Sequence, residues 1–425
     1  MKQASVNERH EALLRSTYAI VLAGGRGKRL GPLTDHRAKP AVPFAGMLKI
    51  IDFALSNCVN SGVRRIGVLT QYKAQSLIRH LERGWHVLSG CLGEFIDVAP
   101  AQQQDGETWY DGTANAVWQN RDLIRESAPR YLLILGGDHV YKMNYRVMLE
   151  EHVRSGAQLT LACLAVPLEA ARDFGVLAVG EDDTVLAFDE KPAEPRADPE
   201  RPGHALASMG VYVFDTEFLM AELARDASDA ASQHDFGRDL IPALLGRARL
   251  RVHRFEHSCV GGADGRPYWR DVGTLDAYYE ANMDLTQVLP ELNLYDDSWP
   301  ILSQQRQLPP AKFVLDEAHR RGLALNSLVA TGCIVSGATV RDSILFSKVR
   351  VGERSLIESS LLLPDVRCGC DVHLNRTIVD KHCRLPDGFV AGLDAPSDMA
   401  RGLYRTPSGV TVVTPAMLGQ AGGVG

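Results

Sequence analysis

The sequence predicts an α/β protein: a doubly wound, mostly parallel (Rossmann-like) sheet domain followed by a C-terminal left-handed parallel β-helix. Two observations on the chain lead to this prediction. From Tyr18 to about Leu285, short apolar runs alternate with segments of helical periodicity. After about Pro310, an apolar residue instead recurs at every sixth position. Such a change of period indicates two architectures, and therefore two domains, within the 425 residues.

Three apolar runs predict neighbouring strands of the sheet. They begin at Tyr18, Arg65 and Tyr131 and read YAIVLA, RIGVLT and YLLILGG. None of them alternates apolar with polar residues, which is the pattern of parallel strands buried on both faces. Right-handed crossovers between such strands produce a sheet whose ligands bind at the carboxyl ends of the strands. The loops after the first and third runs are therefore the expected place for a site.

Helices are expected between these strands. The first helix ends at Gly62, a residue suited to a helix C-terminus. Its buried face is indicated by Ile51, Leu55, Cys58 and Val59. A second helix follows WYDGT, and its buried face is indicated by Ala116, Val117, Leu123 and Ile124.

The six-residue period predicts the β-helix, in which each flat face of a triangular coil points one aliphatic side chain inward. The residues in step are Ile334, Val340 and Phe346, then Val351, Ile357 and Leu363, then Val366, Val372 and Ile378. The register slips between these triplets, so irregular corners are expected. A β-sandwich could also produce short strands, but a strict six-residue spacing of apolar residues favours the β-helix.

Prolines between the two periods mark residues 286–310 as a connector. The sheet domain is then expected at residues 17–285 and the β-helix at residues 311–425.

The composition restricts the partners and the compartment. The net charge of -6 argues against general nucleic-acid binding, which needs an excess of Lys and Arg. No apolar run reaches the roughly 20 residues that span a bilayer, so no membrane partner is expected. The first residues include Glu8 and Glu11 and lack the apolar core of a secretory signal. The eight cysteines are scattered without paired CxxC spacing, which predicts a reduced, cytoplasmic protein.

The loop LAGGRGKRLGPLT after the first strand distinguishes between kinds of phosphate site. A P-loop needs Ser or Thr after its glycine–lysine pair, but Arg29 stands there. A dinucleotide loop needs a third glycine, but Leu30 occupies that position. What remains is a glycine loop containing Gly25, followed by two cations, Arg29 and Lys39, that can offset a polyphosphate's charge. An ordinary turn with solvated charges is the alternative for the loop taken alone.

The order of motifs along nearly the whole chain resembles that of bacterial glucose-1-phosphate adenylyltransferases, also called ADP-glucose pyrophosphorylases. The motifs are LAGGRGKRLGPLT, RAKPAVPF, IIDFALSN, TQYKAQSLIRH, PAQQ, WYDGTANAV, GGDHVYKM, FGV, DEKP, ASMGVYVF and PYWRDVGT. The resemblance implies that the first domain transfers the adenylyl group of ATP to α-D-glucose 1-phosphate. ADP-glucose for glycogen synthesis and pyrophosphate would be the products. It also implies a homotetramer and a β-helix that serves regulation by anionic metabolites and oligomerisation.

The resemblance assigns the catalytic residues. Asp138, at the end of the third strand, and Asp271, in YWRDVGT, would hold Mg²⁺. Two carboxylates suit this hard, oxygen-seeking ion. Arg29 and Lys39 would grip the phosphates of ATP. For an Asp after a strand, a helix cap or a turn is the structural alternative.

The sugar phosphate is assigned mainly to DEKP, where Lys191 would bind the phosphate and Glu190 the sugar hydroxyls. Taken alone, such a pair is usually a solvated surface pair. The other substrate contacts that the resemblance implies are Tyr110 with the nucleotide sugar, Gly175, Ser208 and Tyr212 with the glucose, and Gln102 and Gln103 near the adenine.

Four residues match positions where relatives gather positive charge for allosteric anions: His36, Arg37, Lys49 and Lys381. Many relatives have Lys or Arg where this chain has His36. A histidine is mostly neutral at pH 7, which leaves the identity of the activator open. A solvated basic face is the alternative for this group.

Three other functions compete with adenylyl transfer. Uridylyl or thymidylyl transfer would use the same loop and metal residues. A non-catalytic regulatory subunit would bind the same ligands, but such relatives lose the charged catalytic side chains that this chain retains. An acyltransferase on the β-helix is disfavoured, because His373 and His382 lie in no evident catalytic setting.

Overall fold

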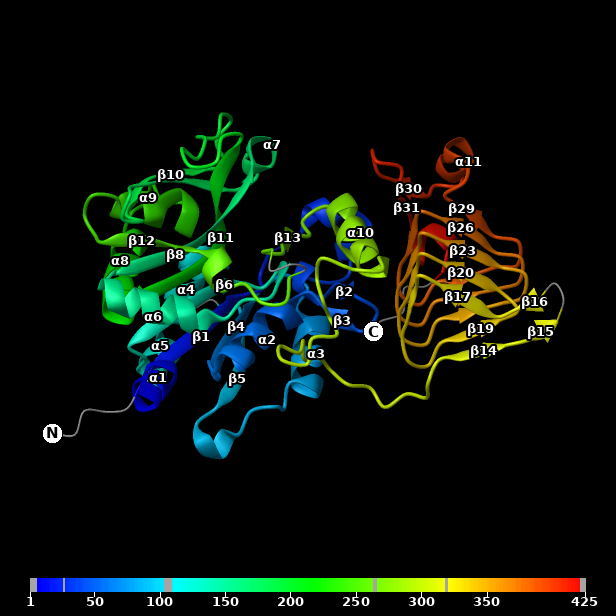
Figure 1. Cartoon of the computed structure of the whole chain (residues 1–425), viewed down its shortest axis with the longest axis horizontal. Coiled ribbons are helices and arrows are strands. Elements are labelled where there is room, and N and C mark those ends of the chain that lie inside the picture. The colour runs from blue at the N-terminus through cyan, green and yellow to red at the C-terminus, as the bar shows by residue number, and fades with distance from the viewer. Residues whose placement is uncertain (1–5, 26, 103–108, 263–265, 318–319, 421–425) are drawn as a thin grey trace.

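The computed structural model describes residues 6–25, 27–102, 109–262, 266–317 and 320–420. Figure 1 shows a sheet domain, coloured blue to green, beside a β-helix, coloured yellow to red. Within the described ranges, no helix is long and apolar enough to cross a bilayer.

The predicted parallel strands are confirmed. β1 (Thr17–Leu22) lies between β4 (Arg65–Thr70) and β6 (Tyr131–Gly136) and is parallel to both, and β5 (Phe95–Pro100) extends the sheet beyond β4. On the other side of β6 the sheet becomes mixed, because β11 (His204–Asp215) is antiparallel to it. The remaining strands of this sheet are β8 (Leu159–Pro167), β9 (Gly175–Val179), β10 (Val185–Glu190) and β12 (Leu250–Arg254).

Both faces of the sheet are covered, as the doubly wound prediction requires. Ala19 and Val21 of β1 belong to one buried cluster with Leu55 of a crossover helix. Tyr18 and Ile20, which point to the opposite face, belong to a second cluster with Val117. The alternating side chains of one strand therefore contact two helical layers.

The first expected helix is α2 (Ile51–Ser61), which ends at Gly62 with a left-handed φ of 87°. The second expected helix is divided into α4 (Thr113–Gln119) and α5 (Arg121–Ser127). At the break, the Asn120 side chain donates a hydrogen bond to the carbonyl of Ala116, at 2.7 Å. An amide side chain that donates to a helical carbonyl competes with the backbone N–H groups for that acceptor. This competition explains why one periodic segment forms two helices.

Other helices and short strands complete the sheet domain. The helices are α1 (Val6–Arg15), α3 (Gln75–Gly84), α6 (Tyr145–Ser155), α7 (Leu168–Ala171), α8 (Thr216–Ala227), α9 (Ile241–Leu244) and α10 (Leu275–Met283). Short 3₁₀ segments include η1 (Lys28–Thr34), which is kinked at Gly31, η2 (Lys39–Ala41), η5 (Phe255–His257) and η7 (Asp284–Thr286), and η4 (Phe236–Leu240) is a π-helical segment. The short strands are β2 (Pro43–Phe44), β3 (Leu48–Lys49), β7 (His139–Tyr141) and β13 (Trp269–Asp271).

The C-terminal domain consists of three parallel ladders, one for each face of a β-helix. The first contains β14 (Lys312–Val314), β19 (Ile334–Ser336), β22 (Arg350–Val351), β25 (Arg367–Cys368) and β28 (Arg384–Leu385). The second contains β17 (Leu323–Leu325), β20 (Thr339–Arg341), β23 (Leu356–Glu358), β26 (His373–Asn375) and β29 (Val390–Ala391). The third contains β18 (Leu328–Val329), β21 (Ile344–Leu345), β24 (Leu361–Leu362), β27 (Thr377–Val379), β31 (Thr411–Val413) and the antiparallel β30 (Tyr404–Arg405). A two-stranded ribbon, β15 (Asp316–Glu317) and β16 (Arg320–Arg321), and helix α11 (Ala395–Ala400) decorate the coils.

The coils have a repeat that corrects part of the sequence prediction. Equivalent serines of successive coils lie 16 residues apart (Ser327 and Ser343) or 17 residues apart (Ser343 and Ser360), whereas three six-residue repeats would give a longer coil. The shortfall moves the inward position on the third face by one residue. The residues that point inward there are Leu345, Leu362 and Val379. The predicted Phe346, Leu363 and Ile378 instead face the sheet domain, because a shift of one residue along a strand reverses the side chain. Ile334 is likewise replaced in the interior by its neighbour Val335.

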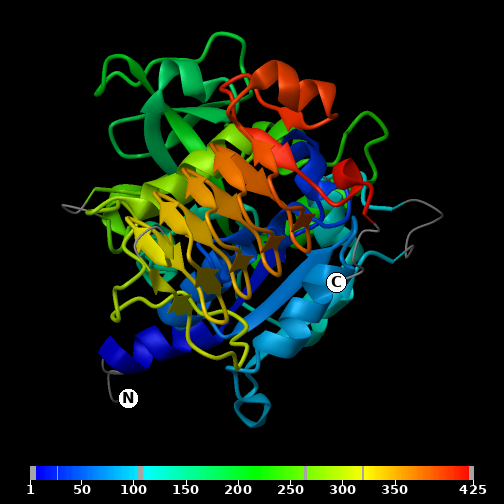
Figure 2. The same cartoon turned by 90° about the vertical axis from the view of Figure 1, so that its right-hand side faces the viewer.

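These outward-facing residues form a hydrophobic core shared by the two domains. Phe346 and Leu363 lie in one buried cluster with Phe44 and Tyr278 of the sheet domain. Figure 2 views the β-helix in front of the sheet domain that it packs against. Polar contacts also cross this boundary, including a hydrogen bond of 2.6 Å from the Tyr279 hydroxyl to the Ser359 carbonyl.

One buried ion pair joins the domains. The Arg37 guanidinium donates two hydrogen bonds of 2.8 Å to the two carboxylate oxygens of Asp380 in the β-helix. The side chains are 3% and 5% exposed. A bidentate pair of this kind fixes orientation as well as distance.

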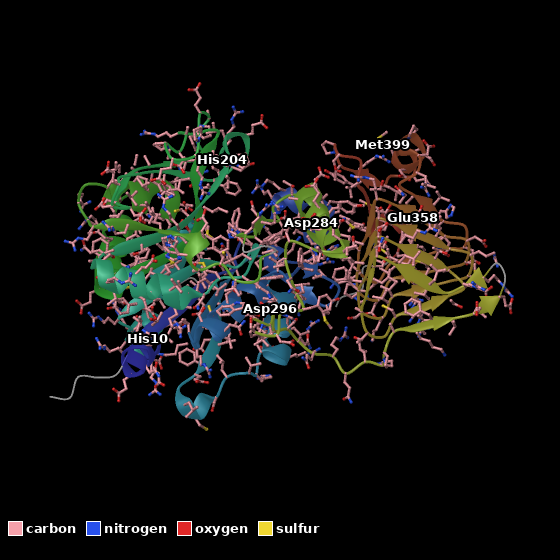
Figure 3. All side chains as sticks on the ribbon, viewed as in Figure 1. His10, His204, Asp284, Asp296, Glu358 and Met399 are labelled. Carbon is pink, nitrogen blue, oxygen red and sulfur yellow. The ribbon has the colours of Figure 1, made fainter. Side chains whose placement is uncertain are left out.

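The segment between η7 and β14 runs from one domain to the other along the base of the molecule in Figure 1. It is bound to the sheet domain rather than loose. The Trp299 indole N–H donates to the side-chain Oδ1 of Asn57 at 3.0 Å, and the Ser303 hydroxyl donates to Asp52 at 2.6 Å. Asp296, labelled in Figure 3, lies 3.7 Å from the ammonium of the buried Lys142.

We predict that Asp380→Asn lowers the free energy of unfolding by about 3 kcal/mol, because it leaves the charge of Arg37 buried without a counter-ion. Replacing both partners, as in Arg37→Met with Asp380→Leu, should cost less than the single change, because no charge then remains buried. Urea unfolding of the three proteins measures both effects. An Asp380→Asn variant as stable as the wild type would contradict the role given to this pair.

Candidate active site

A cleft of about 1050 Å³ opens where β1 and β6 end side by side. Its walls come from the loop after β1, the loop after β6, the end of β10 and the start of α4. The carboxyl edge of the parallel strands is where such a sheet binds ligands. A volume at the upper end of the usual range for ligand pockets has room for two reactants.

The centre of the cleft is an ionic bridge. The Lys39 ammonium donates to Asp138 at 3.0 Å and to Asp271 at 2.7 Å. The Lys39 side chain is only 6% exposed, so its charge is offset mainly by these two carboxylates. The antiparallel pairing of β13 with β7 places Asp271 opposite His139, next to Asp138. Tertiary structure thus brings together the two acids that the resemblance assigned to the metal.

Lys39 and Asp138 each favour the charged form of the other. Burial alone would raise the pKa of Asp138, but the Lys39 ammonium and the His139 ring hold that pKa well below the usual carboxyl range. Burial alone would lower the pKa of Lys39, but Asp138 and Asp271 raise it above its ordinary value. At neutral pH the cleft therefore holds a fixed arrangement of full charges.

The glycine loop packs against the stem of Lys39. Gly27 has a φ of 60°, and a Cβ added there would lie 2.8 Å from the Cβ of Lys39. Glycine at this position lets the Lys39 stem pass close to the loop. At Gly25, in contrast, an added Cβ would meet no protein atom within 4 Å. Packing does not require that glycine, and the space beside it is open to the cleft.

Arg29 stands at the rim of the same charge cluster. Its guanidinium lies 3.5 Å from Asp271 and 3.5 Å from Asp173. The side chain is about half exposed, so these contacts are screened by solvent and leave the cation accessible from the cleft.

A second pair of charges faces the cleft from the end of β10. The Lys191 ammonium lies 2.9 Å from the carboxylate of Glu190, and both residues line the cleft. Lys191 has a left-handed φ of 49°, and its backbone N–H donates to the carbonyl of Phe174. A non-glycine residue in this region is strained, a feature that often accompanies function.

Gly175 lies opposite Glu190 in the β9–β10 pair. A Cβ at this position would come within 2.4 Å of the Phe188 ring and 3.0 Å of Glu190. Glycine is therefore needed here to accommodate Phe188 and Glu190. The predicted contact of Gly175 with a sugar stays a prediction.

The remaining predicted substrate residues differ in their placement. Tyr110 and Tyr212 line the cleft, and the Tyr110 hydroxyl accepts a hydrogen bond of 2.8 Å from Asn120. Ser208 is buried, with its hydroxyl 3.5 Å from that of Tyr212. Gln102 is exposed and is not among the described residues that line the cleft. Gln103 lies outside the described residues.

Sequence reasoning missed several groups at the site. His139 lies with Asp138 and Asp271 in a cluster whose potential ligand atoms are all within 4.8 Å of one another. Its adjacency to Asp138 in LGGDH was the available signal. Asp235, which accepts from Thr113 at 2.9 Å and lines the cleft wall, had no such signal.

The chemistry of this cluster fits a divalent cation. Two ionised carboxylates supply hard oxygen ligands, and the neighbouring imidazole could supply a nitrogen. The open cleft beside them leaves coordination positions for a substrate or water.

The predicted anion-binding residues gather at the domain boundary, with one correction. Arg37 is engaged by Asp380 and buried, so its guanidinium is not presented to an anion from solvent. Burial lowers the pKa of Lys49 to about 8, with Asp52 opposing this shift and the charges of Lys381, Arg37 and Arg79 adding to it. Burial and then the Arg37 charge also lower the pKa of Lys381. His36 is exposed.

Comparison with known proteins places the chain among nucleotidyltransferases. The nucleotidyl transferase family matches residues 18–288, and the GlmU-like C-terminal hexapeptide family matches residues 309–413. The hexapeptide match supports the predicted left-handed β-helix.

Similar proteins include a glucose-1-phosphate adenylyltransferase from Nitrosospira multiformis, 57% identical over 97% of this chain and 96% of that protein. The enzyme of the same name from Dechloromonas aromatica is 56% identical over 97% of this chain and 94% of its own length. That from Methylobacillus flagellatus is 57% identical over 96% of this chain and 95% of its own length.

The two loop glycines provide a matched test of the site's packing. Gly27→Ala should destabilise the protein by about 1–2 kcal/mol, because the new side chain is in a left-handed conformation and collides with Lys39. Gly25→Ala should change stability by less than about 0.5 kcal/mol, because its side chain meets no protein atom. Thermal unfolding of both variants measures the difference. Equal losses in the two variants would show that the loop does not depend on the Gly27–Lys39 contact.

Proposed function

This chain belongs to the glucose-1-phosphate adenylyltransferase family, and on that premise we propose how its cleft joins ATP to α-D-glucose 1-phosphate. The products are ADP-glucose, the sugar donor for glycogen synthesis, and pyrophosphate. The observation that carries the proposal is the bridge of Lys39 to Asp138 and Asp271 beside an open glycine loop.

The reaction needs positioning and charge neutralisation more than covalent help. A phosphate oxygen of the sugar attacks the α-phosphorus of ATP in line, the bond to the β-phosphate oxygen breaks, and pyrophosphate leaves. Both reactants are anions that repel each other. Fixed cations in a prepared cleft offset this repulsion without reorganisation during the reaction. No protein nucleophile is required.

We assign the ATP side to the glycine loop and its cations. The space beside Gly25 allows a polyphosphate to approach the backbone, and Arg29 presents an accessible guanidinium there. Lys39 supplies a buried ammonium whose raised pKa keeps it charged. These groups bind and orient the phosphates that become pyrophosphate.

We further propose that Asp138 and Asp271 hold Mg²⁺, with His139 beside them. When bound, the ion neutralises phosphate charge that Lys39 and Arg29 alone leave in excess. The low pKa of Asp138 supports this role, because its carboxylate stays ionised at any pH where the enzyme works.

The sugar phosphate belongs, in this proposal, to the other wall of the cleft. The Lys191 ammonium binds its phosphate, and the Glu190 carboxylate accepts hydrogen bonds from sugar hydroxyls. Tyr212, at the base of that wall, contacts the glucose, with Ser208 behind it. Tyr110 contacts the nucleotide sugar from the opposite side.

The proposal extends to assembly and regulation. Three apolar side chains of the connector, Val288, Leu289 and Tyr295, are 89%, 86% and 82% exposed, which favours burial in an oligomer such as a homotetramer. Lys49 and Lys381, with the charge of Arg37 behind them, are proposed to attract anionic metabolites at the domain boundary. The proposed compartment is the cytoplasm.

A pyrophosphate-release assay with Mg²⁺ and glucose 1-phosphate tests the function. ATP should support turnover, and UTP and dTTP should be poor substrates. Asp138→Asn should lower kcat by at least about 100-fold, because it removes a charge that is fixed for the transition state, and its melting temperature should show that the fold persists. Near-normal turnover of Asp138→Asn would refute the metal role, and preference for UTP or dTTP would refute the choice of nucleotide.

The pKa of Lys49 predicts how anion binding at the boundary depends on pH. An anion binds the charged ammonium, and Lys49 loses its proton near pH 8. Its charged fraction, and with it the affinity for sulfate, should fall about tenfold between about pH 7 and pH 9. Lys49→Arg stays charged and should weaken this dependence, with any remainder coming from Lys381, whose pKa is also lowered. Sulfate titration by calorimetry provides the measurement, and an identical pH dependence in both proteins would exclude Lys49 from the site.

A further inference from the structure

Three side chains that none of the preceding roles uses lie together at one edge of the sheet. Glu151 comes from α6, His253 from the edge strand β12, and His257 from the turn η5 that follows it. One candidate ligand atom from each of the three side chains lies within 4.8 Å of the other two. None of the three lines the catalytic cleft. We propose that they form a second metal site, one that takes a transition-metal ion such as Zn²⁺.

The distances suit three ligands around one small ion. Glu151 places one carboxylate oxygen 2.6 Å from Nδ1 of His253 and the other 3.5 Å from Nδ1 of His257. Ligand atoms about 2.0–2.2 Å from a tetrahedral zinc ion are spaced by roughly 3.3 Å, between these two values. The Nδ1 atoms of both imidazoles face the same Glu151 carboxylate, so both rings direct a nitrogen toward the same region.

The surroundings of His253 support metal binding through Nδ1. This side chain is fully buried, and its Nε2 lies 2.7 Å from the Ser258 hydroxyl. With Nδ1 bound to a metal, Nε2 carries the proton and donates a hydrogen bond to the Ser258 hydroxyl. Hydrogen bonds of this kind, from the far nitrogen of a ligating histidine, orient the ring in metal sites.

The site is also accessible. The His257 side chain is 53% exposed, and the carboxylate of Glu151 is about one-quarter exposed. A hollow of about 400 Å³ adjoins both residues. It gives an ion a path from solvent and leaves space for water as a further ligand.

Nearby positive charge is largely compensated. Arg154, Arg251 and Arg254 line the same hollow. Arg251 pairs with Asp182 at 2.6 Å, and Arg254 pairs with Asp183 at 3.2 Å. Because these two arginines are paired with other carboxylates, the negative charge of Glu151 can offset the charge of a metal ion. An anion held by the arginines is the competing occupant.

The donor set distinguishes this site from the catalytic carboxylates. Imidazole nitrogens favour zinc, cobalt, nickel and copper, whereas carboxylate oxygens favour magnesium. A metal here would tie α6 to the edge strand β12 and the turn after it. Its expected effect is on stability, independent of the transfer reaction.

The test uses the full-length protein, freed of metal by a chelator and then held in excess Mg²⁺ so that the catalytic carboxylates are occupied. Co²⁺ titration should produce a visible absorption band that saturates at one ion per chain. Zn²⁺ should displace the Co²⁺ and remove the band. Zn²⁺ should also raise the melting temperature. His257→Ala should weaken Co²⁺ binding by at least about tenfold and abolish the stabilisation. Because His257 is half exposed, this variant should fold, and Glu151→Gln provides an independent second variant.

Two controls complete the design. Asp138→Asn changes the catalytic cluster, and His373→Ala removes an exposed histidine of the β-helix. Both should bind Co²⁺ as the wild type does. Unchanged Co²⁺ binding in His257→Ala, or loss of the band in Asp138→Asn, would overturn the proposal. The proposal would also be overturned if inorganic phosphate, instead of Zn²⁺, stabilised the protein and Arg154→Ala abolished that stabilisation. The hollow would then be an anion site.

Discussion

The mutual attraction of one ammonium and two carboxylates organises the catalytic half of this protein. Lys39 is buried, and a buried ammonium without partners would be costly. Asp138 and Asp271 lie close enough to share that ammonium and would repel each other without it. The buried ammonium therefore depends on the two carboxylates, and the ammonium in turn allows the two carboxylates to lie close together. The cleft is charged before any substrate arrives, which is the condition for stabilising a highly charged transition state.

The scaffold holds this arrangement through backbone contacts as well as side chains. Parallel pairing of β1 with β6 brings the glycine loop beside Asp138, and pairing of β7 with β13 delivers Asp271. The left-handed Gly27 leaves space for the Lys39 stem. The precision of the site thus depends on elements from three distant parts of the chain.

The same short segment links the cleft to the β-helix. Arg37 is held by Asp380 of the C-terminal domain, and Lys39, two positions later, is held by the catalytic carboxylates. Ala38 between them is fully buried. A displacement of the β-helix cannot move Asp380 without acting on a segment whose other end is in the active site. Lys49 and Lys381 lie close enough to Arg37 at this junction for its charge to lower the pKa of both.

Much of the architecture and of the site was predictable from the sequence, because it depends on neighbours along the chain. The apolar runs determined β1, β4 and β6, and helical spacing with Gly62 determined α2. The six-residue period predicted the β-helix, and ordered motifs identified the charged residues around Lys39. The periodicity of a segment reflects its own backbone geometry, so these strands, helices and coils could be predicted without knowing which distant residues are in contact.

Tertiary structure decided what depends on contacts between distant residues. It divided one expected helix at Asn120, and it turned Phe346 outward because the coils have 16 or 17 residues instead of three full six-residue repeats. It gave Arg37 a partner in Asp380, and it assembled Glu151 with His253 and His257. Pairing register, coil length and domain packing are set by the whole fold. For that reason the sequence determined the order of the motifs and their charged residues, and the folded chain decided which of these residues meet.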